Sequence, residues 1–416
     1  MGLTALQVHG EGLGAASTGE YRGAMTAARF GDPQAEWAAL RTACGVYDLG
    51  FRAKISLTGG DRVRWLNGMV TNNIRDLAAG HGVYAFLLNP QGRILGDLYA
   101  YNRGESITVD TDRSQLEKIL ATFEHYIIMD DVEVQRMFSP DEGVRGSTDG
   151  GVRGSTDGGV RGSTDGGSAE PENFTGHGAA DASSAREVTT LGIGGPRALE
   201  VMKKAGIDVP GLQPLQLHEI QCDCDCGCVT CTIARTDGPV ESYEIWLEPA
   251  HARPLWNALV KAGATPAGSE ALELERIVSG IPLYGVDIRE RDLPQETEQA
   301  RALNFNKGCY VGQEIVERIR SRGSVHRKFA GFLAEATAQI VPGAKILAGE
   351  KEVGEITSAA SLPSTEGDRT IALGYIRREA GGPGREVIIG ATRATVVSLP
   401  VEDAVLAESS LARHPA

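Results

Sequence analysis

The segment between Lys307 and Glu314 reads KGCYVGQE and concentrates side chains that can do chemistry. It contains a lysine, a thiol, a phenol, an amide and a carboxylate, and its two glycines permit a tight turn. The residues that follow are typical of a helix, so we expect Cys309 close to a helix start and two residues from Lys307. Both features lower the pKa of a thiol and raise its reactivity. The octet therefore predicts a functional thiol, with a surface turn that carries a small buried cysteine as the alternative.

A second group of thiols follows a strict alternation, with a further cysteine after two more residues. On a single strand, four alternating thiols would share one face. Soft thiolates bind zinc, copper(I) and iron–sulfur clusters, so a metal site is one interpretation. However, four residues of one extended strand lie in a line, whereas a tetrahedral site needs ligands from two segments. We therefore favour a strand whose inward positions are cysteines, and the alternative is a metal site built from Cys222, Cys224, Cys226, Cys228 and Cys231.

The overall composition narrows the function classes. At 416 residues the chain is too long for one compact core, and two or three domains are expected. A net charge of −14 argues against general binding of a phosphate backbone, so no direct contact with nucleic acid is expected. The sequence shows no signal peptide and no long apolar stretch, which predicts no membrane association. The cysteines do not form a secreted disulfide pattern, and we expect a cytoplasmic monomer with reduced thiols.

Strand-like and helix-like segments alternate in the first three quarters of the chain. Lys54 to Leu57 alternates like a strand, and Asp61 offers an N-cap for a short helix. Ile107 to Val109 is another strand-like run, and Ser269 to Val278 has the apolar period of a helix. This interleaving predicts mixed α and β layers.

Composition also predicts where the domains begin and end. Three copies of GVRGSTDG occupy residues 143 to 166, and such a composition cannot bury a core. We predict an N-terminal arm or short leading helix, an interrupted α+β region, a flexible insertion, a barrel and a tail. These parts cover residues 1–30, 31–140 with 186–322, 141–185, 323–402 and 403–416, respectively.

Beyond Gly323 the sequence changes to short strand-like runs separated by turn residues. Their spacing is typical of a small β-barrel of about 75 residues. The expected strands are Phe329–Leu333, Lys345–Leu347, Glu352–Thr357, Ile371–Ile376, Glu386–Ile389 and Arg393–Leu399.

The segment from Glu275 to Glu317 contains GIPLYGVD, LPQE and KGCYVGQE in that order. It resembles the YgfZ-type folate-binding proteins, which are relatives of the glycine-cleavage T-protein, an aminomethyltransferase. The upstream motifs YDLG, LNGMVTNNI, LLNPQGRILGDL and GGPRAL are similar to those of the same superfamily. The resemblance covers roughly residues 40 to 400 apart from the repeats. KGCYVGQE points to the YgfZ-type branch, whereas the other motifs mark the wider superfamily.

This resemblance implies an α+β fold in which a three-lobed ring of mixed α/β lobes surrounds a central channel, with a C-terminal β-barrel as the last lobe. It implies tetrahydrofolate or a one-carbon derivative as the ligand. It also implies a role in the assembly or repair of iron–sulfur cluster enzymes, some of which modify tRNA. The partners would then be iron–sulfur enzymes or cluster-assembly proteins. The alternative is a folate-dependent aminomethyl or one-carbon transferase.

The resemblance also nominates site residues. Cys309, supported by Lys307, would be the functional thiol, and Asp97 would be the general acid or electrostatic partner of a transferase. Arg276 precedes the G-x-x-LYG segment and could meet folate carboxylates bidentately. For Asn72 and Asn73 a plain turn is the alternative. The candidate folate contacts are Asn72, Asn73, Asp97, Glu241, Tyr243, Glu244, Arg276, Tyr310, Gln313 and Glu314.

Two departures from the T-protein pattern weigh against transferase chemistry. The T-protein carries paired aspartates where this chain has Gly96 and Asp97. Its T-G-E-x-G-[YF]-E run corresponds here to the stretch from Asp237 to Glu244, of which only the end matches. The sequence therefore favours a non-enzymatic folate-binding factor over a transferase.

Overall fold

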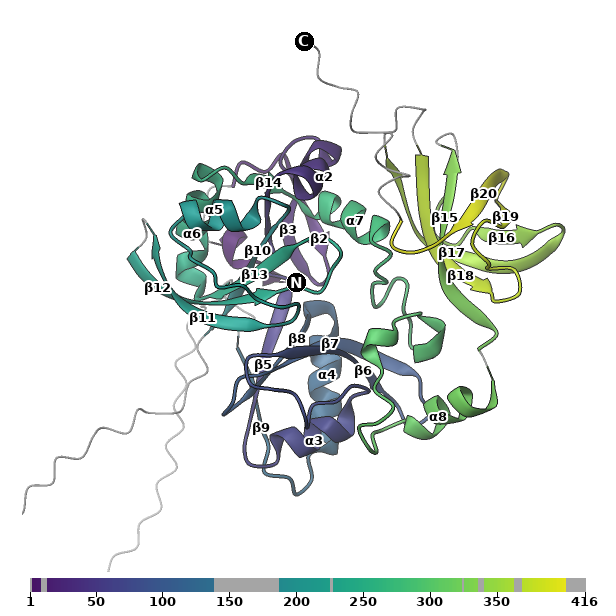
Figure 1. The fold of residues 1–416 in the computed structure, drawn as a ribbon, viewed down its shortest axis with the longest axis horizontal. Helices are drawn as coiled ribbons and strands as arrows, with labels where there is room; N and C mark the ends of the chain where they lie inside the picture. Colours follow the sequence, from purple (N-terminus) through teal and green to yellow (C-terminus); the bar gives the residue numbers. More distant parts are fainter. Residues whose placement is uncertain are drawn as a thin grey trace, which may run out of the picture.

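The computed structural model describes residues 2–8, 13–137, 187–224, 227–323, 325–335, 340–362 and 369–401. The predicted insertion at 141–185 and the predicted tail at 403–416 lie outside the described residues. Three lobes surround a common centre, as Figure 1 shows. Among the described helices, none is both long and apolar enough to span a membrane.

The first lobe combines a six-stranded and a three-stranded sheet with helices. Its strands are β1 (Gly2–Leu3), β2 (Ser17–Tyr21), β3 (Ala24–Arg29), β4 (Gly45–Asp48), β10 (Thr189–Gly194), β11 (Leu217–Cys224), β12 (Gly227–Arg235), β13 (Ser242–Leu247) and β14 (Thr265–Ala267). Its helices are α1 (Ala5–Val8), α2 (Pro33–Thr42), α5 (Ala198–Lys204), α6 (Pro249–Lys261) and α7 (Ser269–Val278). The strand orders are β11-β12-β13-β10-β4-β14 and β1-β3-β2.

The structure corrects the prediction that the N-terminal residues form an arm, because they form strands that pair with one another. β1 pairs in parallel with β3, and β2 pairs with β3 in antiparallel. The hydroxyls of Thr4 and Thr26 donate to the buried carboxylate of Asp48, which ties this sheet to β4. Ala24 and Ala27 of β3 are buried. The strands escaped prediction because small residues produce little hydrophobic periodicity.

The second lobe is a five-stranded sheet of order β6-β7-β8-β5-β9 with two helices. Its elements are β5 (Arg52–Thr58), β6 (Gly82–Leu88), β7 (Ile94–Asn102), β8 (Ile107–Asp112), β9 (Glu133–Arg136), α3 (Arg62–Met69) and α4 (Arg113–Tyr126). Leu98 and Ala100 of β7 are buried in the core with Phe123 of α4. Because strand residues alternate, Asp97 and Tyr99 face the other side of the sheet.

The third lobe is a closed six-stranded barrel of order β15-β18-β17-β16-β19-β20. Its strands are β15 (Arg327–Glu335), β16 (Lys345–Ala348), β17 (Lys351–Leu362), β18 (Arg369–Arg377), β19 (Glu386–Ile389) and β20 (Thr392–Val397). Each of the six predicted strands overlaps one of these. The α+β architecture with a C-terminal barrel is thus confirmed.

A connecting segment joins the first lobe to the barrel and runs along the second lobe. It contains the short turns η1 (Pro294–Glu296) and η2 (Ala300–Ala302) and the helix α8 (Gln313–Arg322). In Figure 1, α8 lies between the second lobe and the barrel. This segment carries the KGCYVGQE octet, so the octet lies at the outer edge of the second lobe.

Candidate active site

A cavity of about 220 Å³ opens where the first and second lobes meet. Its walls come from β4, β7, β13, α7 and the turn between β2 and β3. Aromatic rings form much of the lining, and they are those of Tyr21, Tyr47, Phe51, Tyr99 and Tyr101. Flat rings of this kind suit a flat aromatic ligand. We call this cavity the channel.

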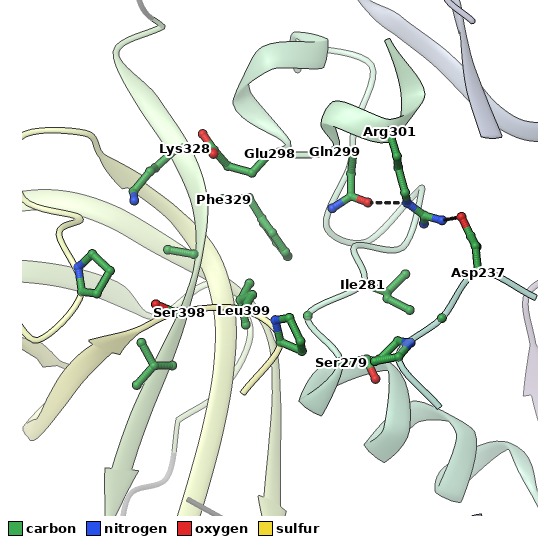
Figure 2. Close-up of a pocket in the computed structure, with 17 residues that line it drawn as sticks. Asp237, Ser279, Ile281, Glu298, Gln299, Arg301, Lys328, Phe329, Ser398 and Leu399 are labelled. Carbon is green, nitrogen blue, oxygen red and sulfur yellow. Dashed lines mark hydrogen bonds and ion pairs between the residues drawn. The ribbon is translucent and has the colours of Figure 1, made fainter. Parts of the chain in front are cut away.

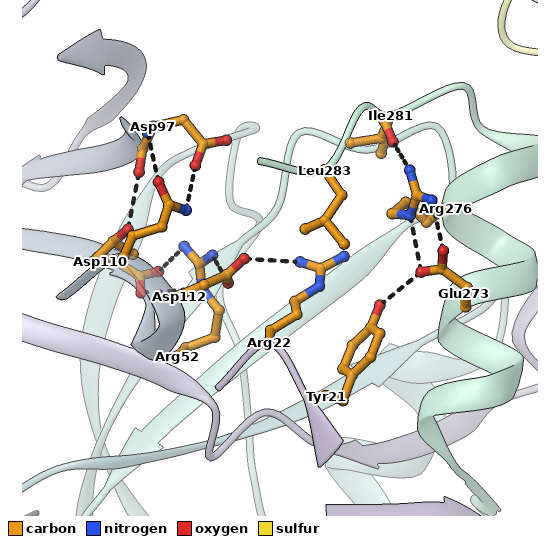
Figure 3. A network of polar contacts seen from close by, with 12 residues as sticks. Tyr21, Arg22, Arg52, Asp97, Asp110, Asp112, Glu273, Arg276, Ile281 and Leu283 are labelled. Atoms are coloured by element: carbon orange, nitrogen blue, oxygen red, sulfur yellow. Dashed lines mark hydrogen bonds and ion pairs between the residues drawn. The ribbon is translucent and has the colours of Figure 1, made fainter. Parts of the chain in front are cut away.

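A network of charged side chains lies along one side of the channel. Arg52 forms ion pairs with Asp110 at 3.1 Å and Asp112 at 2.6 Å, and Arg22 lies 3.6 Å from Asp112 (Figure 3). Lys54, which is 1% exposed, pairs with Asp110 at 2.9 Å. Such buried charges require partners, and here each cation has at least one carboxylate. The network fixes the polar wall of the channel.

Glu244 is the carboxylate that this network presents to the channel. Its Oε2 accepts hydrogen bonds from Nζ of Lys54 at 3.4 Å and from Nε1 of Trp246 at 2.8 Å. Among the described residues, no donor is found for its Oε1. Because an ionised carboxylate has about four acceptor positions, Glu244 retains the capacity to bind a ligand N–H group.

The neighbouring candidates of this strand do not line the channel. The side chain of Tyr243 packs into the first lobe's core, and its hydroxyl donates to Glu241 at 2.6 Å. Glu241 is exposed. Strand alternation explains the split, because Tyr243 and Glu244 must point to opposite faces of β13. Of these three predicted contacts, the structure brings only Glu244 to the channel.

Asp97 lies on β7, on the same face as the channel residue Tyr99, but it is not among the residues that line the channel. Its carboxylate accepts from Nε2 of Gln115 at 2.6 Å and from the hydroxyl of Tyr84 at 2.7 Å. Burial raises the pKa of Asp97, and the nearby charge of Asp112 adds to the effect. The side chain is therefore held in one orientation, with a proton affinity above that of an ordinary aspartate.

The structure corrects the predicted role of Arg276. Its guanidinium is 4% exposed and has all five N–H groups engaged. The acceptors are Glu273, which takes two bonds, Asp287, Ser358 and the carbonyl of Ile281. These groups belong to α7, the connecting segment and β17, as Figure 3 shows in part. Arg276 borders the channel, but it joins lobes and has no N–H group left for a folate carboxylate.

Asn72 and Asn73 form a turn and do not contact the channel, which corrects their assignment as folate contacts. The amide of Asn72 donates to the carbonyls of Tyr84 and Arg301 at 2.8 Å. The amide of Asn73 donates to Asp76 at 2.8 Å, and its oxygen accepts from the backbone of Asp76. Asparagine side chains commonly stabilise turns in this way.

In the octet, Lys307 anchors the loop to the second lobe. Its side chain is 1% exposed, and its ammonium donates to the carbonyls of Asn67 and Val70 at the end of α3. Burial, and to a smaller extent the nearby charge of Arg75, lowers the pKa of Lys307 to about 8. Lys307 therefore holds the loop, and its predicted support of the Cys309 thiol stays a prediction.

Cys309 has an exposed thiol, which excludes the alternative of a small buried cysteine. Tyr310 is buried in an apolar cluster with Phe86 and Val316, and the ammonium of Lys307 lies 4.7 Å from its ring centre. Gln313 and Glu314 form the first turn of α8. The octet lies outside the channel lining, so Tyr310, Gln313 and Glu314 are not channel contacts.

The cysteine cluster does not lie on a single strand as expected, because the chain reverses within it. β11 ends at Cys224 and β12 begins at Gly227. Cys222 and Cys231 face the core, whereas Cys228 is exposed. Cys226 and the side chain of Cys224 lie outside the described residues. Within the described part of the chain, no group of three His, Cys, Asp or Glu residues is placed to hold a metal ion.

Several site residues were missed from the sequence. Lys54 carries a signal that could have been used, because a charged residue stands there between the apolar Ala53 and Ile55 of β5. Arg301 gave no such signal, although it pairs with Asp237 and lies 4.4 Å from the ring centre of Tyr84. The loop of Asp237 lines both the channel and a second cavity of about 450 Å³ beside the barrel, and Figure 2 shows this second cavity.

Several aminomethyltransferases are similar to this chain over most of its length. An aminomethyltransferase of Rubrobacter xylanophilus is 29% identical over 360 residues, which are 86% of this chain and 82% of that protein. An aminomethyltransferase of Streptomyces coelicolor is 27% identical over 92% of this chain and 91% of that protein. The crystal structure of the glycine cleavage system aminomethyltransferase T from Bartonella henselae covers 94% of this chain and 95% of its own, with 21% identity and a TM-score of 0.73. The last comparison establishes a shared T-protein fold.

Family models match most of the chain. Residues 11–140 and 176–307 match the GCVT N-terminal domain, and residues 327–403 match the glycine cleavage T-protein C-terminal barrel domain. The two matches follow each other in the order of the lobes described above. The chain therefore belongs to the glycine cleavage T-protein (GCVT) family.

Proposed function

We propose that this protein binds tetrahydrofolate, or a one-carbon derivative of it, in the channel and carries out aminomethyltransferase-like one-carbon transfer. The family uses tetrahydrofolate as a substrate or cofactor. The observation that carries the proposal is the Glu244 carboxylate, whose Oε2 is held by Lys54 and Trp246 while Oε1 has no donor among the described residues. This reading departs from the non-enzymatic factor that the sequence favours.

The residues of the channel fit the ligand. The pyrimidine ring of a reduced pterin is flat and carries several N–H groups on one edge. These features match the aromatic walls and the Oε1 atom of Glu244. The p-aminobenzoyl-glutamate portion is anionic at its end. Arg22 and Arg52 place positive charge on the same wall of the channel. Charge-assisted hydrogen bonds of this kind are about twice as strong as neutral ones.

The bound folate supplies the nitrogen atoms that accept a one-carbon unit. Within the protein, Glu244 would orient the ring, and the aromatic residues would exclude water from it. Asp97 would act as a proton acceptor or as a stabilising charge beside the reacting centre, because Gln115 and Tyr84 hold its carboxylate in one orientation. Its raised pKa suits this task, since an efficient catalytic group has a pKa nearer the working pH.

Glu244→Gln is expected to weaken tetrahydrofolate binding by about 10- to 100-fold, the value of a lost charge-assisted hydrogen bond of about 1.5–3 kcal/mol. The change keeps the size of the side chain but removes its charge. Isothermal titration calorimetry measures the affinity without depending on the fluorescence of Trp246, which contacts residue 244 directly.

Glu241→Gln is the matched control, because it makes the same chemical change three residues away at an exposed position outside the channel. Its affinity should equal that of the wild type. If the wild-type protein does not bind tetrahydrofolate, the proposed function fails. Equal affinities of the two variants would remove Glu244 from the site.

We propose as a second candidate function that the protein is an assembly or repair factor for iron–sulfur enzymes, because the octet resembles that of the YgfZ-type branch. The supporting observation is an exposed thiol on a rigid support. Lys307 fastens the loop to α3, and Gly312 approaches the carbonyl oxygen of Asn89 so closely that a Cβ atom would lie 2.5 Å from it. Such a fixed, outward-facing Cys309 suits contact with another protein or its cluster.

Cys309→Ala is expected to abolish support of a cluster enzyme while leaving tetrahydrofolate affinity unchanged, because the thiol lies outside the channel. The measurement is the activity of a client iron–sulfur enzyme in cells that lack the protein and carry either variant. Cys228→Ala, which removes another exposed thiol, is the control and should behave as wild type. Full support by the Cys309→Ala protein would reduce Cys309 to a loop residue.

A further inference from the structure

Two thiols of the cysteine cluster meet in the core of the first lobe and do not line the channel. Cys222 of β11 is 0% exposed and Cys231 of β12 is 1% exposed. Cys222 lies opposite Val229 and Cys231 lies opposite Ile220, so the two cysteines are diagonal neighbours on the inner face of the hairpin. Their sulfur atoms are 3.1 Å apart.

The two thiols differ in acidity because they share a hydrogen bond. The bond lowers the pKa of Cys222, since its thiolate is stabilised by the thiol of Cys231, and it raises the pKa of Cys231. An asymmetric pair of this kind contains one sulfur suited to attack and one suited to resolve. By contrast, burial raises the pKa of the separate core thiol Cys44 to about 11, and we expect it to be inert.

We propose that Cys222 and Cys231 are a redox-active dithiol that a hydroperoxide oxidises to a reversible disulfide across the β11–β12 hairpin. The Cys222 thiolate attacks the peroxide, the O–O bond breaks, and the leaving oxygen takes a proton, giving water and a sulfenic acid when hydrogen peroxide is the oxidant. The sulfur of Cys231 then attacks that of Cys222, the S–O bond breaks, and a second water leaves with the thiol proton. The two sulfurs lose two electrons in total, and the peroxide gains them.

The place of the hairpin in the sheet gives the oxidant access. β11 is the edge strand of the six-stranded sheet, and β12 is its neighbour among the described strands of that sheet. Edge strands open locally at a lower free energy than central ones, which would expose the inner thiols to a small oxidant. β12 in turn pairs with β13, where Ala234 lies opposite Glu244 of the channel. Because Cys231 precedes Ala234 by three residues, the disulfide would form on the strand that lies next to Glu244.

The sequence permits a direct test by mass spectrometry. The protein is treated with hydrogen peroxide, remaining thiols are alkylated under denaturing conditions, and the chain is cleaved before aspartates. Cleavage before Asp223 separates Cys222, in the fragment 208–222, from Cys231, in the fragment 225–236. We expect these two fragments to be linked after oxidation and released by dithiothreitol. Fragmentation between Cys228 and Cys231 then shows which cysteine carries the link.

Matched variants make the assignment independent of the fragmentation. The link should be lost in Cys231→Ala and kept in Cys228→Ser, which alters an exposed thiol of the same fragment. Alkylation of Cys309 reports how far an exposed thiol has reacted in the same sample. A link that runs to Cys226 or Cys228 would overturn the proposal. So would its absence from the wild type at peroxide doses that oxidise Cys309.

Discussion

Arg276→Met is expected to lower the free energy of unfolding by about 3–5 kcal/mol, the usual cost of breaking a buried ion pair. The arginine is removed from a site where Asp287 is fully buried, so that an aspartate charge is left without its cation. Asp287 keeps hydrogen bonds from Thr357, Ser358 and the backbone of Leu283, but these do not neutralise it. Urea denaturation followed by circular dichroism measures the change.

A matched substitution and a double variant separate this effect from the loss of any arginine. Arg64→Met removes an arginine whose side chain is 68% exposed and pairs with Asp61 and Asp130, and surface pairs are worth about 0–1 kcal/mol. Adding Asp287→Asn to Arg276→Met should recover part of the stability, because the uncompensated charge disappears. If Arg276→Met lowers the free energy of unfolding no more than Arg64→Met does, the contacts of Arg276 between the lobes do not stabilise the protein.

The barrel and the helix α7 could be predicted because their signals are local. All six barrel strands carry their own apolar runs between turn residues, and Ser269–Val278 was predicted with the observed ends. The mixed layers of the other lobes follow from the same periodicity. The order in which strands pair is different, since it depends on contacts between residues far apart in the chain.

The cysteine run shows how a regular pattern can mislead. Alternation between Cys222 and Cys228 suggests one strand, but the period of two continues through the hairpin turn. Asp225 and Gly227 are residue types common in turns, but the alternating cysteines hide this signal, and the thiol that meets Cys222 is Cys231. The direction of a strand depends on the strand with which it pairs. A two-residue period in the sequence carries no information about that pairing.

The sequence indicates which polar residues have side chains suited to a folate, but it does not show with which protein groups each of them is paired. Arg276 and Glu244 are both suited to a folate by residue type, yet Arg276 has every N–H group engaged, whereas Oε1 of Glu244 has no donor within the described part of the chain. The difference lies in the partners: Arg276 donates to Asp287 and Ser358, among others, whereas Glu244 accepts from Lys54 and Trp246. These partners come from distant segments, and only the fold brings them together.

Asp97→Asn is expected to reduce one-carbon transfer by about 10²- to 10⁴-fold, the usual contribution of a positioned acid or base. The amide has the same shape and can keep its contacts with Gln115 and Tyr84, but it carries no charge and holds no titratable proton. Tetrahydrofolate affinity should therefore stay close to that of the wild type. Formation of methylenetetrahydrofolate from an aminomethyl donor measures the transfer.

The pH dependence gives this prediction a second readout. If ionised Asp97 is required, activity falls as the pH drops through its pKa, which burial raises above the ordinary value of about 3.9. The rate of the wild type should therefore fall at acidic pH with a midpoint above the ordinary pKa of an aspartate. The residual activity of Asp97→Asn should show no such fall. Asp76→Asn, at an exposed turn of the same lobe, should keep both the rate and its fall at acidic pH. Unchanged transfer in Asp97→Asn would exclude Asp97 from the chemistry while leaving folate binding through Glu244 intact, because the two residues act on separate strands.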